Sequence, residues 1–216
     1  MIIGVLNQKG GVGKTTMSLN IAAELARRKN RVLLIDADVQ GSCLDWAAAR
    51  SQLDAGPLFT CIGLPRATIH KEIVSLSQDY DHIIIDGVPR YSDITRSAIM
   101  SSDLVAIPIQ PSPFDVWSAA DVVKLIQEAQ VYKPALQANF LINRVIAGTV
   151  IGRSLDDALE SHQFKPFESR VHQRVVFAEA AMNGSALFET EGERGRATIE
   201  VSCLVSEILR KGEHNG

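Results

Sequence analysis

The chain of 216 residues is predicted to fold as one α/β domain built on a mostly parallel sheet. Apolar, β-branched runs alternate with amphipathic stretches along the whole chain, with short links between them. Several runs are apolar on both faces, as strands of a parallel sheet covered by helices must be. Neither an internal repeat nor a long linker divides the sequence, so we expect a single domain over residues 1–216.

Each predicted strand is followed by a predicted helix. The expected strands are Ile2–Leu6, Val32–Ile35, Leu58–Ile62, His82–Ile85, Leu104–Ile109 and Ala138–Ile142. The expected helices are Thr15–Arg28, Ser42–Leu53, Ala67–Ser77, Ser92–Met100 and Phe114–Gln130. Right-handed crossovers bring the carboxyl ends of parallel strands to one edge of the sheet, so the loops after the strands should meet there.

The pattern loosens after Asn143. The expected elements are a helix over Ser154–His162, an extended piece over Phe167–Val171, a helix over Arg174–Asn183 and a final helix over Arg196–Leu209. Gly184 stands where a helix should stop, because glycine readily adopts the left-handed conformation that ends helices. The last three residues are polar, and we expect them to be frayed.

Composition excludes several classes of protein. With 46% apolar and 22% charged residues, the chain is neither disordered nor fibrous. Its net charge of −3 does not suit a protein that coats nucleic acid with its whole surface, so DNA binding would need a local patch or assembly. No apolar run is long enough to cross a membrane, and Met1–Leu6 lacks the basic flank of a signal peptide. The dispersed Cys43, Cys61 and Cys203 suggest no metal framework and fit a reducing cytoplasm.

Residues 8–16 read Gln-Lys-Gly-Gly-Val-Gly-Lys-Thr-Thr, between the first strand and the first helix. Glycines let backbone N–H groups converge on phosphate oxygens, and the helix N-terminus adds a favourable dipole. Lys14 can reach the β- and γ-phosphates, and the Thr15 hydroxyl can bind magnesium. A glycine-rich turn with chance lysines is the alternative, but the flanking strand and helix and the intact Gly-Lys-Thr favour nucleotide binding. The expected ATP-binding residues of this loop are Lys9, Gly10, Gly11, Val12, Gly13, Lys14, Thr15 and Thr16.

The loop departs from the usual spacing because Gln8 stands where a glycine is expected and because Lys9 adds a second lysine. On chemistry alone, Lys9 could be a solvated surface lysine. The sequence Lys-Gly-Gly-Val-Gly-Lys-Thr resembles the deviant Walker A loop of the ParA/MinD family of P-loop ATPases. This resemblance implies dimerisation on ATP, with Lys9 reaching across to the partner's phosphates as an arginine finger does.

Carboxylates follow two of the strands. Asp36 and Asp38 come after Val32–Ile35, and Asp86 ends the run Ile83-Ile84-Ile85 as in a Walker B element. Such acids can hold the magnesium shell together with Thr15, although acids at these places also cap helices. The segment from Asp36 to Gly41 resembles the first ParA switch, which implies that Asp38 positions the attacking water. The family's usual proline is replaced by Val39.

The resemblance assigns further parts of the chain. Asp86-Gly87-Val88-Pro89-Arg90 looks like the second switch, with a backbone that moves with the γ-phosphate. By the same resemblance Asn143 contacts adenine, while a turn-forming asparagine is the alternative. The proline-rich stretch Ile107–Pro113 also resembles the family's loop, and no chemistry is assigned to it. With no strong general base beside the acids, Lys9, Lys14 and Asp38 would catalyse a slow hydrolysis by positioning and charge neutralisation.

The segment Arg174–Ala181 resembles short, plasmid-type ParA proteins, which bind DNA without sequence preference through basic C-terminal side chains. The candidates here are Arg170, Arg174, Arg194, Arg196, Arg210 and Lys211. A solvated helix face is the alternative explanation for each of them. The basic run Arg27–Arg31 ends the first helix, where cations favour the helix dipole, so we interpret it as structural.

The sequence thus predicts a ParA-type partition ATPase in the cytoplasm, associated with the nucleoid. Its cofactors would be ATP and Mg²⁺, and its partners a second copy of the chain, non-specific DNA, and a ParB-type or other adaptor, with no membrane partner. Its cargo could be a plasmid, a chromosome origin or a protein assembly. A MinD-type membrane ATPase is the alternative, but residues 207–214 lack a basic amphipathic helix. A metabolic or redox relative is a third possibility. Such a protein would need either cysteines on particular loops to bind a cluster, or a small molecule that accepts phosphate.

Overall fold

The computed structural model describes residues 1–89, 92–147, 159 and 162–213. In this part of the chain, seven strands form one sheet in the order β3-β2-β4-β1-β5-β6-β7, and all neighbouring pairs are parallel. The strands are β1 (Ile2–Val5), β2 (Val32–Asp36), β3 (Thr60–Gly63), β4 (His82–Asp86), β5 (Leu104–Ile109), β6 (Gln137–Val145) and β7 (Pro166–His172). The predicted α/β class and parallel sheet are confirmed.

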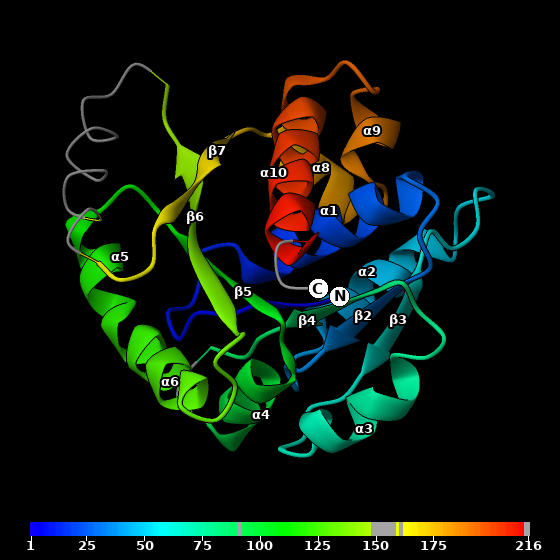
Figure 1. The fold of residues 1–216 in the computed structure, drawn as a ribbon. Helices are drawn as coiled ribbons and strands as arrows, with labels where there is room; N and C mark the ends of the chain where they lie inside the picture. The colour runs from blue at the N-terminus through cyan, green and yellow to red at the C-terminus, as the bar shows by residue number, and fades with distance from the viewer. Residues whose placement is uncertain (90–91, 148–158, 160–161, 214–216) are drawn as a thin grey trace.

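Helices cover both faces of the sheet (Figure 1). They are α1 (Lys14–Arg27), α2 (Ser42–Arg50), α3 (Ile69–Leu76), α4 (Asp93–Ser101), α5 (Pro113–Ser118), α6 (Ala120–Gln130), α8 (Val176–Met182), α9 (Leu187–Thr190) and α10 (Arg196–Glu213). One apolar core lies under α3, α4, α5 and α6, and the other lies under α1, α2, α8, α9 and α10. The central strands contribute to both cores, which explains why they are apolar on both faces.

The six predicted strands are confirmed, with ends that differ by up to three residues, and the extended piece at Phe167–Val171 becomes the edge strand β7. Gly184 follows α8 with φ 63°, as predicted for a helix stop. A Cβ on Gly184 would lie 2.3 Å from the backbone nitrogen of Arg50, so only glycine lets α8 end this close to α2.

The single helix predicted over Phe114–Gln130 is wrong, because the segment forms two helices that meet at Ala119. The Ala119 N–H is shared between the carbonyl oxygens of Asp115 and Val116, and the Ser118 hydroxyl also donates to the Asp115 carbonyl. These contacts are typical of a helix terminus. The short helix α9 was not predicted. The helix expected over Ser154–His162 and the frayed end at 214–216 lie largely or wholly outside the described residues.

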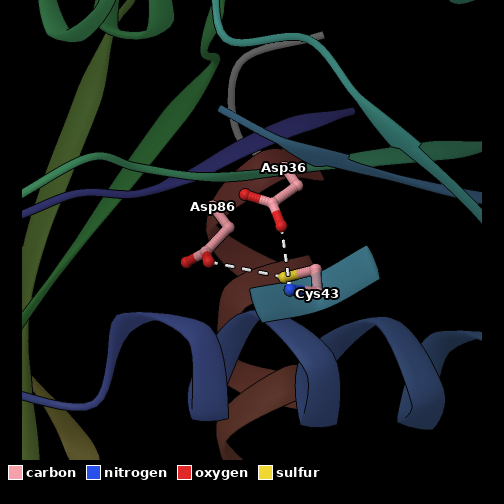
Figure 2. A group of neighbouring side chains, drawn as sticks. All are labelled: Asp36, Cys43 and Asp86. Carbon is pink, nitrogen blue, oxygen red and sulfur yellow. Dashed lines mark hydrogen bonds between the residues drawn. The ribbon is translucent and has the colours of Figure 1, made fainter. Parts of the chain in front are cut away.

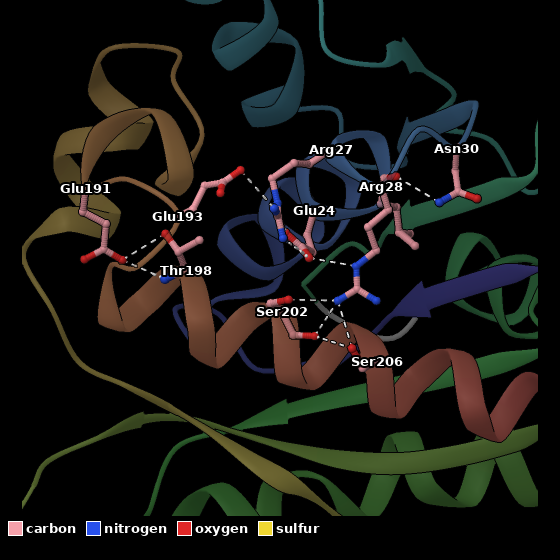
Figure 3. A network of polar contacts seen from close by, with 10 residues as sticks. Glu24, Arg27, Arg28, Asn30, Glu191, Glu193, Thr198, Ser202 and Ser206 are labelled. Atoms are coloured by element: carbon pink, nitrogen blue, oxygen red, sulfur yellow. Dashed lines mark hydrogen bonds and ion pairs between the residues drawn. The ribbon is translucent and has the colours of Figure 1, made fainter.

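A polar network fastens α1 to α10 (Figure 3). Glu24 is 3% exposed and accepts hydrogen bonds from Arg27 at 2.7 Å and from Arg28 at 2.8 Å. Arg28 also donates to the Ser202 carbonyl at 2.7 Å and to the Ser206 hydroxyl at 2.9 Å. Burial alone would raise the pKa of Glu24, but the hydrogen bonds from the two arginines hold that pKa below its usual value. The structural interpretation of this basic run is confirmed at Arg27 and Arg28.

Replacing Glu24 tests this network. We expect Glu24→Ala to lower the free energy of unfolding by about 2–3 kcal/mol, because two partly buried guanidinium groups lose their carboxylate. Urea denaturation would measure the change. The matched control is Glu193→Ala, which removes an exposed carboxylate 3.4 Å from Arg27 and should cost less than about 0.5 kcal/mol. Equal losses for both variants would contradict the role of the network.

Candidate functional site

The glycine-rich loop joins β1 to α1 at the carboxyl edge of the sheet. Gly11 and Gly13 have φ values of 76° and 96°, and residues other than glycine rarely adopt such backbone conformations. A Cβ on Gly13 would lie 2.2 Å from the amide nitrogen of Asn143, so this glycine also lets β6 approach the loop. The Lys14 ammonium donates to the Lys9 carbonyl at 2.9 Å and thus lies inside the loop. Burial lowers the pKa of Lys14, while Asp86 and Asp38 act in the opposite sense.

Two buried carboxylates lie side by side at this edge. The register of β2 and β4 pairs Asp36 with Asp86, and the residues are 0% and 1% exposed. Asp86 accepts hydrogen bonds from the Thr15 hydroxyl at 2.7 Å and the Ser18 hydroxyl at 2.9 Å. It therefore ties the first turn of α1 to the end of β4.

The first turn of α2 closes the same site (Figure 2). The Cys43 N–H donates to Asp36 at 2.8 Å, and its sulfur lies 3.4 Å from Oδ2 of Asp86. Burial raises the pKa of the Cys43 thiol far above its usual range, so the thiol stays neutral at physiological pH. Cys43 could not be predicted from the sequence, because only the first turn of α2 brings it against the two carboxylates at the ends of β2 and β4.

The donor set fits a magnesium ion. Burial raises the pKa of Asp86 to about 6, although the hydrogen bonds from Thr15 and Ser18 lower it, and burial also raises the pKa of Asp36. Two ionised carboxylates so close together repel each other, and a hard divalent cation relieves this repulsion. Oxygen atoms of Asp36, Asp86 and Thr15 are suitable ligands, directly or through water, whereas the Cys43 sulfur is too soft for magnesium.

The first expected switch is a tight turn between β2 and α2. The Asp38 N–H donates to Asp36 at 3.0 Å, and the Gln40 N–H donates to Asp38 Oδ1 at 3.0 Å. Gly41 follows with φ 68°. Asp38 is half-buried and its charge acts to raise the pKa of Lys14, whereas Val39 is exposed. Asp38 is therefore close to the phosphate loop. Of the second switch, residues 86–89 are described and Arg90 is not.

Lys9 does not extend freely into solvent. Its ammonium lies 2.7 Å from Oδ2 of Asp115 on α5, and its side chain is 36% exposed. Nearby, the proline-rich stretch supports the loop, because Asn7 donates to the Pro108 carbonyl at 2.8 Å and Gln110 donates to the Gly11 carbonyl at 3.1 Å.

A cavity of about 750 Å³ opens beside the loop. Its lining includes Thr16, Asn143 and Phe177. The Asn143 amide donates to the Val12 carbonyl at 2.9 Å, and its oxygen accepts from the Arg144 N–H at 2.9 Å. The second contact joins two neighbouring residues of β6, and the place of Asn143 in the cavity suits a base contact.

The six basic candidates for DNA binding do not form one patch. Arg170 and Arg174 are engaged locally: Arg170 donates to the Phe167 carbonyl, and Arg174 pairs with Glu200 and lines the cavity next to Asn143. Arg194 and Arg196 are exposed before and at the start of α10, while Arg210 and Lys211 lie near its end. A rise of 1.5 Å per residue puts roughly 20 Å between the two groups.

Helix α10 also bears on membrane binding. Among the described residues, no helix combines the length and hydrophobicity needed to cross a bilayer. The apolar side of α10 is used inside the protein, where Val201, Leu204 and Ile208 are buried in the core. This helix therefore has little apolar surface left for lipid.

Comparisons with known proteins agree with this geometry. A family model described as the CobQ/CobB/MinD/ParA nucleotide binding domain matches residues 3–188. The maintenance of carboxysome distribution protein A of Halothiobacillus neapolitanus is 30% identical over 213 residues, which cover 96% of this chain and 95% of the relative. The chromosome-partitioning ATPase Soj of Thermus thermophilus is 26% identical over 86% of each chain. The solved structure of apo McdA from Cyanothece has a TM-score of 0.78 at 18% identity over 96% of this chain and 98% of that one, which shows a shared fold.

The buried Asp86 carboxylate yields a pH-dependent prediction. Its pKa in the folded state lies above its ordinary value, so ionised Asp86 costs stability above pH 6, and this cost disappears as the pH falls toward 4. Without nucleotide and magnesium, Asp86→Asn should therefore raise the free energy of unfolding at pH 7.5 by about 1–3 kcal/mol. Urea denaturation in a chelator, at pH 7.5 and pH 5, would measure it.

The gain should shrink at pH 5, because the native carboxyl is then protonated. Asp54→Asn, at an exposed loop position, is the control and should change stability by less than about 0.5 kcal/mol at both pH values. A destabilised Asp86→Asn at pH 7.5 would show that its hydrogen bonds outweigh the cost of the buried charge.

Proposed function

The chain belongs to the CobQ/CobB/MinD/ParA family of nucleotide-binding proteins, and from this premise we propose that it is a ParA-type positioning ATPase. It binds Mg-ATP, closes into a dimer around two nucleotides, binds DNA without sequence preference, and hydrolyses ATP slowly until a partner stimulates it. Release of DNA on hydrolysis then lets the protein segregate or position a cargo.

One observation carries the proposal: the glycine-rich loop and two buried carboxylates share one edge of the sheet. The loop's N–H groups and Lys14 take the phosphates, because they offer donors and positive charge at a helix N-terminus. Thr15, Asp36 and Asp86 hold the magnesium shell. Magnesium bound there would neutralise phosphate charge. Thr16 and Asn143 line the neighbouring cavity, which would take the rest of the nucleotide.

Hydrolysis needs an oriented water. Asp38 is the candidate for this role, because it is half-buried in the turn after β2 and close to Lys14. Positioning and charge neutralisation then supply the catalysis, which favours slow turnover.

In the proposed dimer, Lys9 has a different role from Lys14. Lys14 donates to the backbone of its own loop, whereas the Lys9 side chain extends to α5 and is partly exposed. An ammonium group at that place can stabilise the phosphates of a facing copy, as an arginine finger does in trans.

Basic side chains and the names of the relatives support the proposed DNA binding and cargo. The best DNA candidates are the exposed Arg194, Arg196 and Arg210, together with the half-buried Lys211. A dimer doubles them, which raises avidity despite the net charge of −3. Relatives are named for carboxysome distribution and for chromosome partitioning, so the cargo is DNA or a protein assembly, reached through a ParB-type or other adaptor. The place of action would be the cytoplasm, on the nucleoid. The buried apolar side of α10 does not favour the MinD-like membrane alternative.

The two lysines should give different defects. Lys14→Ala should weaken ATP binding roughly 10- to 100-fold, because it removes a charged hydrogen bond to the phosphates. Lys9→Ala should keep ATP binding within about threefold and yet stay monomeric with ATP. Isothermal titration and light scattering would measure both properties. Dimers of Lys9→Ala at the wild-type ATP concentration would contradict the role in trans.

DNA binding should depend on ATP and on salt. In gel shifts, the protein should bind random-sequence duplex DNA with ATP but not with ADP or without nucleotide, since only the dimer joins both sets of basic side chains. Raising the salt from 50 to 200 mM should weaken binding roughly a thousandfold.

Replacing both Arg210 and Lys211 with glutamine should weaken DNA binding. The control Arg66→Gln, at an exposed residue on the loop before α3, should not. Equal binding with ADP and ATP would contradict the switch. ATP-dependent sedimentation with vesicles, in place of DNA binding, would support the membrane alternative.

A further inference from the structure

We propose that Asp115 holds Lys9 within its own subunit, so that helix α5 sets how much ATP the chain needs before it dimerises. This inference rests on the proposed dimer, because it concerns the route by which Lys9 becomes available to a second copy. It assigns a positioning role to a residue of α5 that lies 106 positions from Lys9 in the chain.

The contact is short and one of its partners is buried. The Lys9 ammonium lies 2.7 Å from Oδ2 of Asp115, and Asp115 is 3% exposed. Within the described part of the chain, the other carboxylate oxygen, Oδ1, is buried and has no hydrogen-bond partner. Lys9 therefore supplies the side-chain contact that compensates the charge of Asp115.

Moving Lys9 away from Asp115 is unfavourable for this reason. A carboxylate that is buried and has lost its cation carries a desolvation penalty, and no other residue in the described part of the chain offsets it. In the proposed dimer the Lys9 ammonium must leave Asp115 to reach the partner's phosphates. The contacts made in the dimer must outweigh the loss of this ion pair, so the pair keeps the ATP-free chain monomeric.

The position of Asp115 does not depend on the ion pair alone. Asn7 and Gln110 connect the phosphate loop to the segment before α5 by hydrogen bonds of 2.8 and 3.1 Å. Val116, next to Asp115, is buried in the core under α5. A neutral residue at position 115 should therefore leave the loop and helix in place and remove only the attraction for Lys9.

The test is the ATP concentration at which half of the protein is dimeric, measured by light scattering with a non-hydrolysable ATP analogue. Asp115→Asn should lower this concentration roughly tenfold relative to the wild type. The matched control Asp121→Asn, at an exposed acid in the first turn of α6, should leave it unchanged. Asp115→Ser repeats the test if the asparagine variant does not fold, as judged by circular dichroism.

A second readout follows Lys9 itself without nucleotide. Acetylation of Lys9 by a water-soluble reagent, measured by mass spectrometry against exposed Lys71, should be several-fold faster in Asp115→Asn than in the wild type. A folded variant with the wild-type dimerisation midpoint overturns the inference and leaves the proposed function intact. A wild type that stays monomeric at saturating nucleotide overturns both.

Discussion

The site depends on the carboxylate of Asp86. This side chain ends a central strand and accepts hydrogen bonds from Thr15 and Ser18 on α1, while the Cys43 thiol of α2 lies against it. These bonds fix the start of α1 to the sheet, and the register of β2 and β4 adds Asp36 beside Asp86. Burial makes the ionised form of Asp86 unfavourable. It also makes the site suitable for a cation, because the carboxylates of Asp36 and Asp86 lie close together and a cation would relieve their repulsion.

The two lysines of the loop lie in different surroundings, although only four residues separate them. Lys14 is buried and bonded to the loop's own backbone, so the phosphates can take the place of a neutral carbonyl oxygen. Lys9 points to another element, where it neutralises a buried carboxylate. In the proposed dimer, binding nucleotide and engaging a second copy would therefore be separate events with separate energetic requirements, which suits a switch better than an enzyme adapted for rapid turnover.

Much of this arrangement could be predicted from the sequence. Continuous apolar runs such as Ile83–Ile85 identify buried parallel strands, and parallel strands bring the residues that follow them to one edge. The glycines and Lys14 could be predicted because their chemistry is local. The break between α5 and α6 at Ala119 could not be predicted, because it depends on how two carbonyl groups share the Ala119 N–H. Cys43 beside Asp86, Asp115 under Lys9 and Arg174 against Glu200 are contacts between distant segments, which local patterns do not encode.

The central claim is that two copies close over two nucleotides and that each lends Lys9 to the other. A crystal structure with magnesium and a non-hydrolysable ATP analogue tests it most directly. The account predicts a dimer in which each Lys9 ammonium lies about 3 Å from the partner's phosphate oxygens, at the usual length of such a bond, and no longer contacts Asp115. A nucleotide-bound subunit that stands alone, with Lys9 still paired to Asp115, would contradict it.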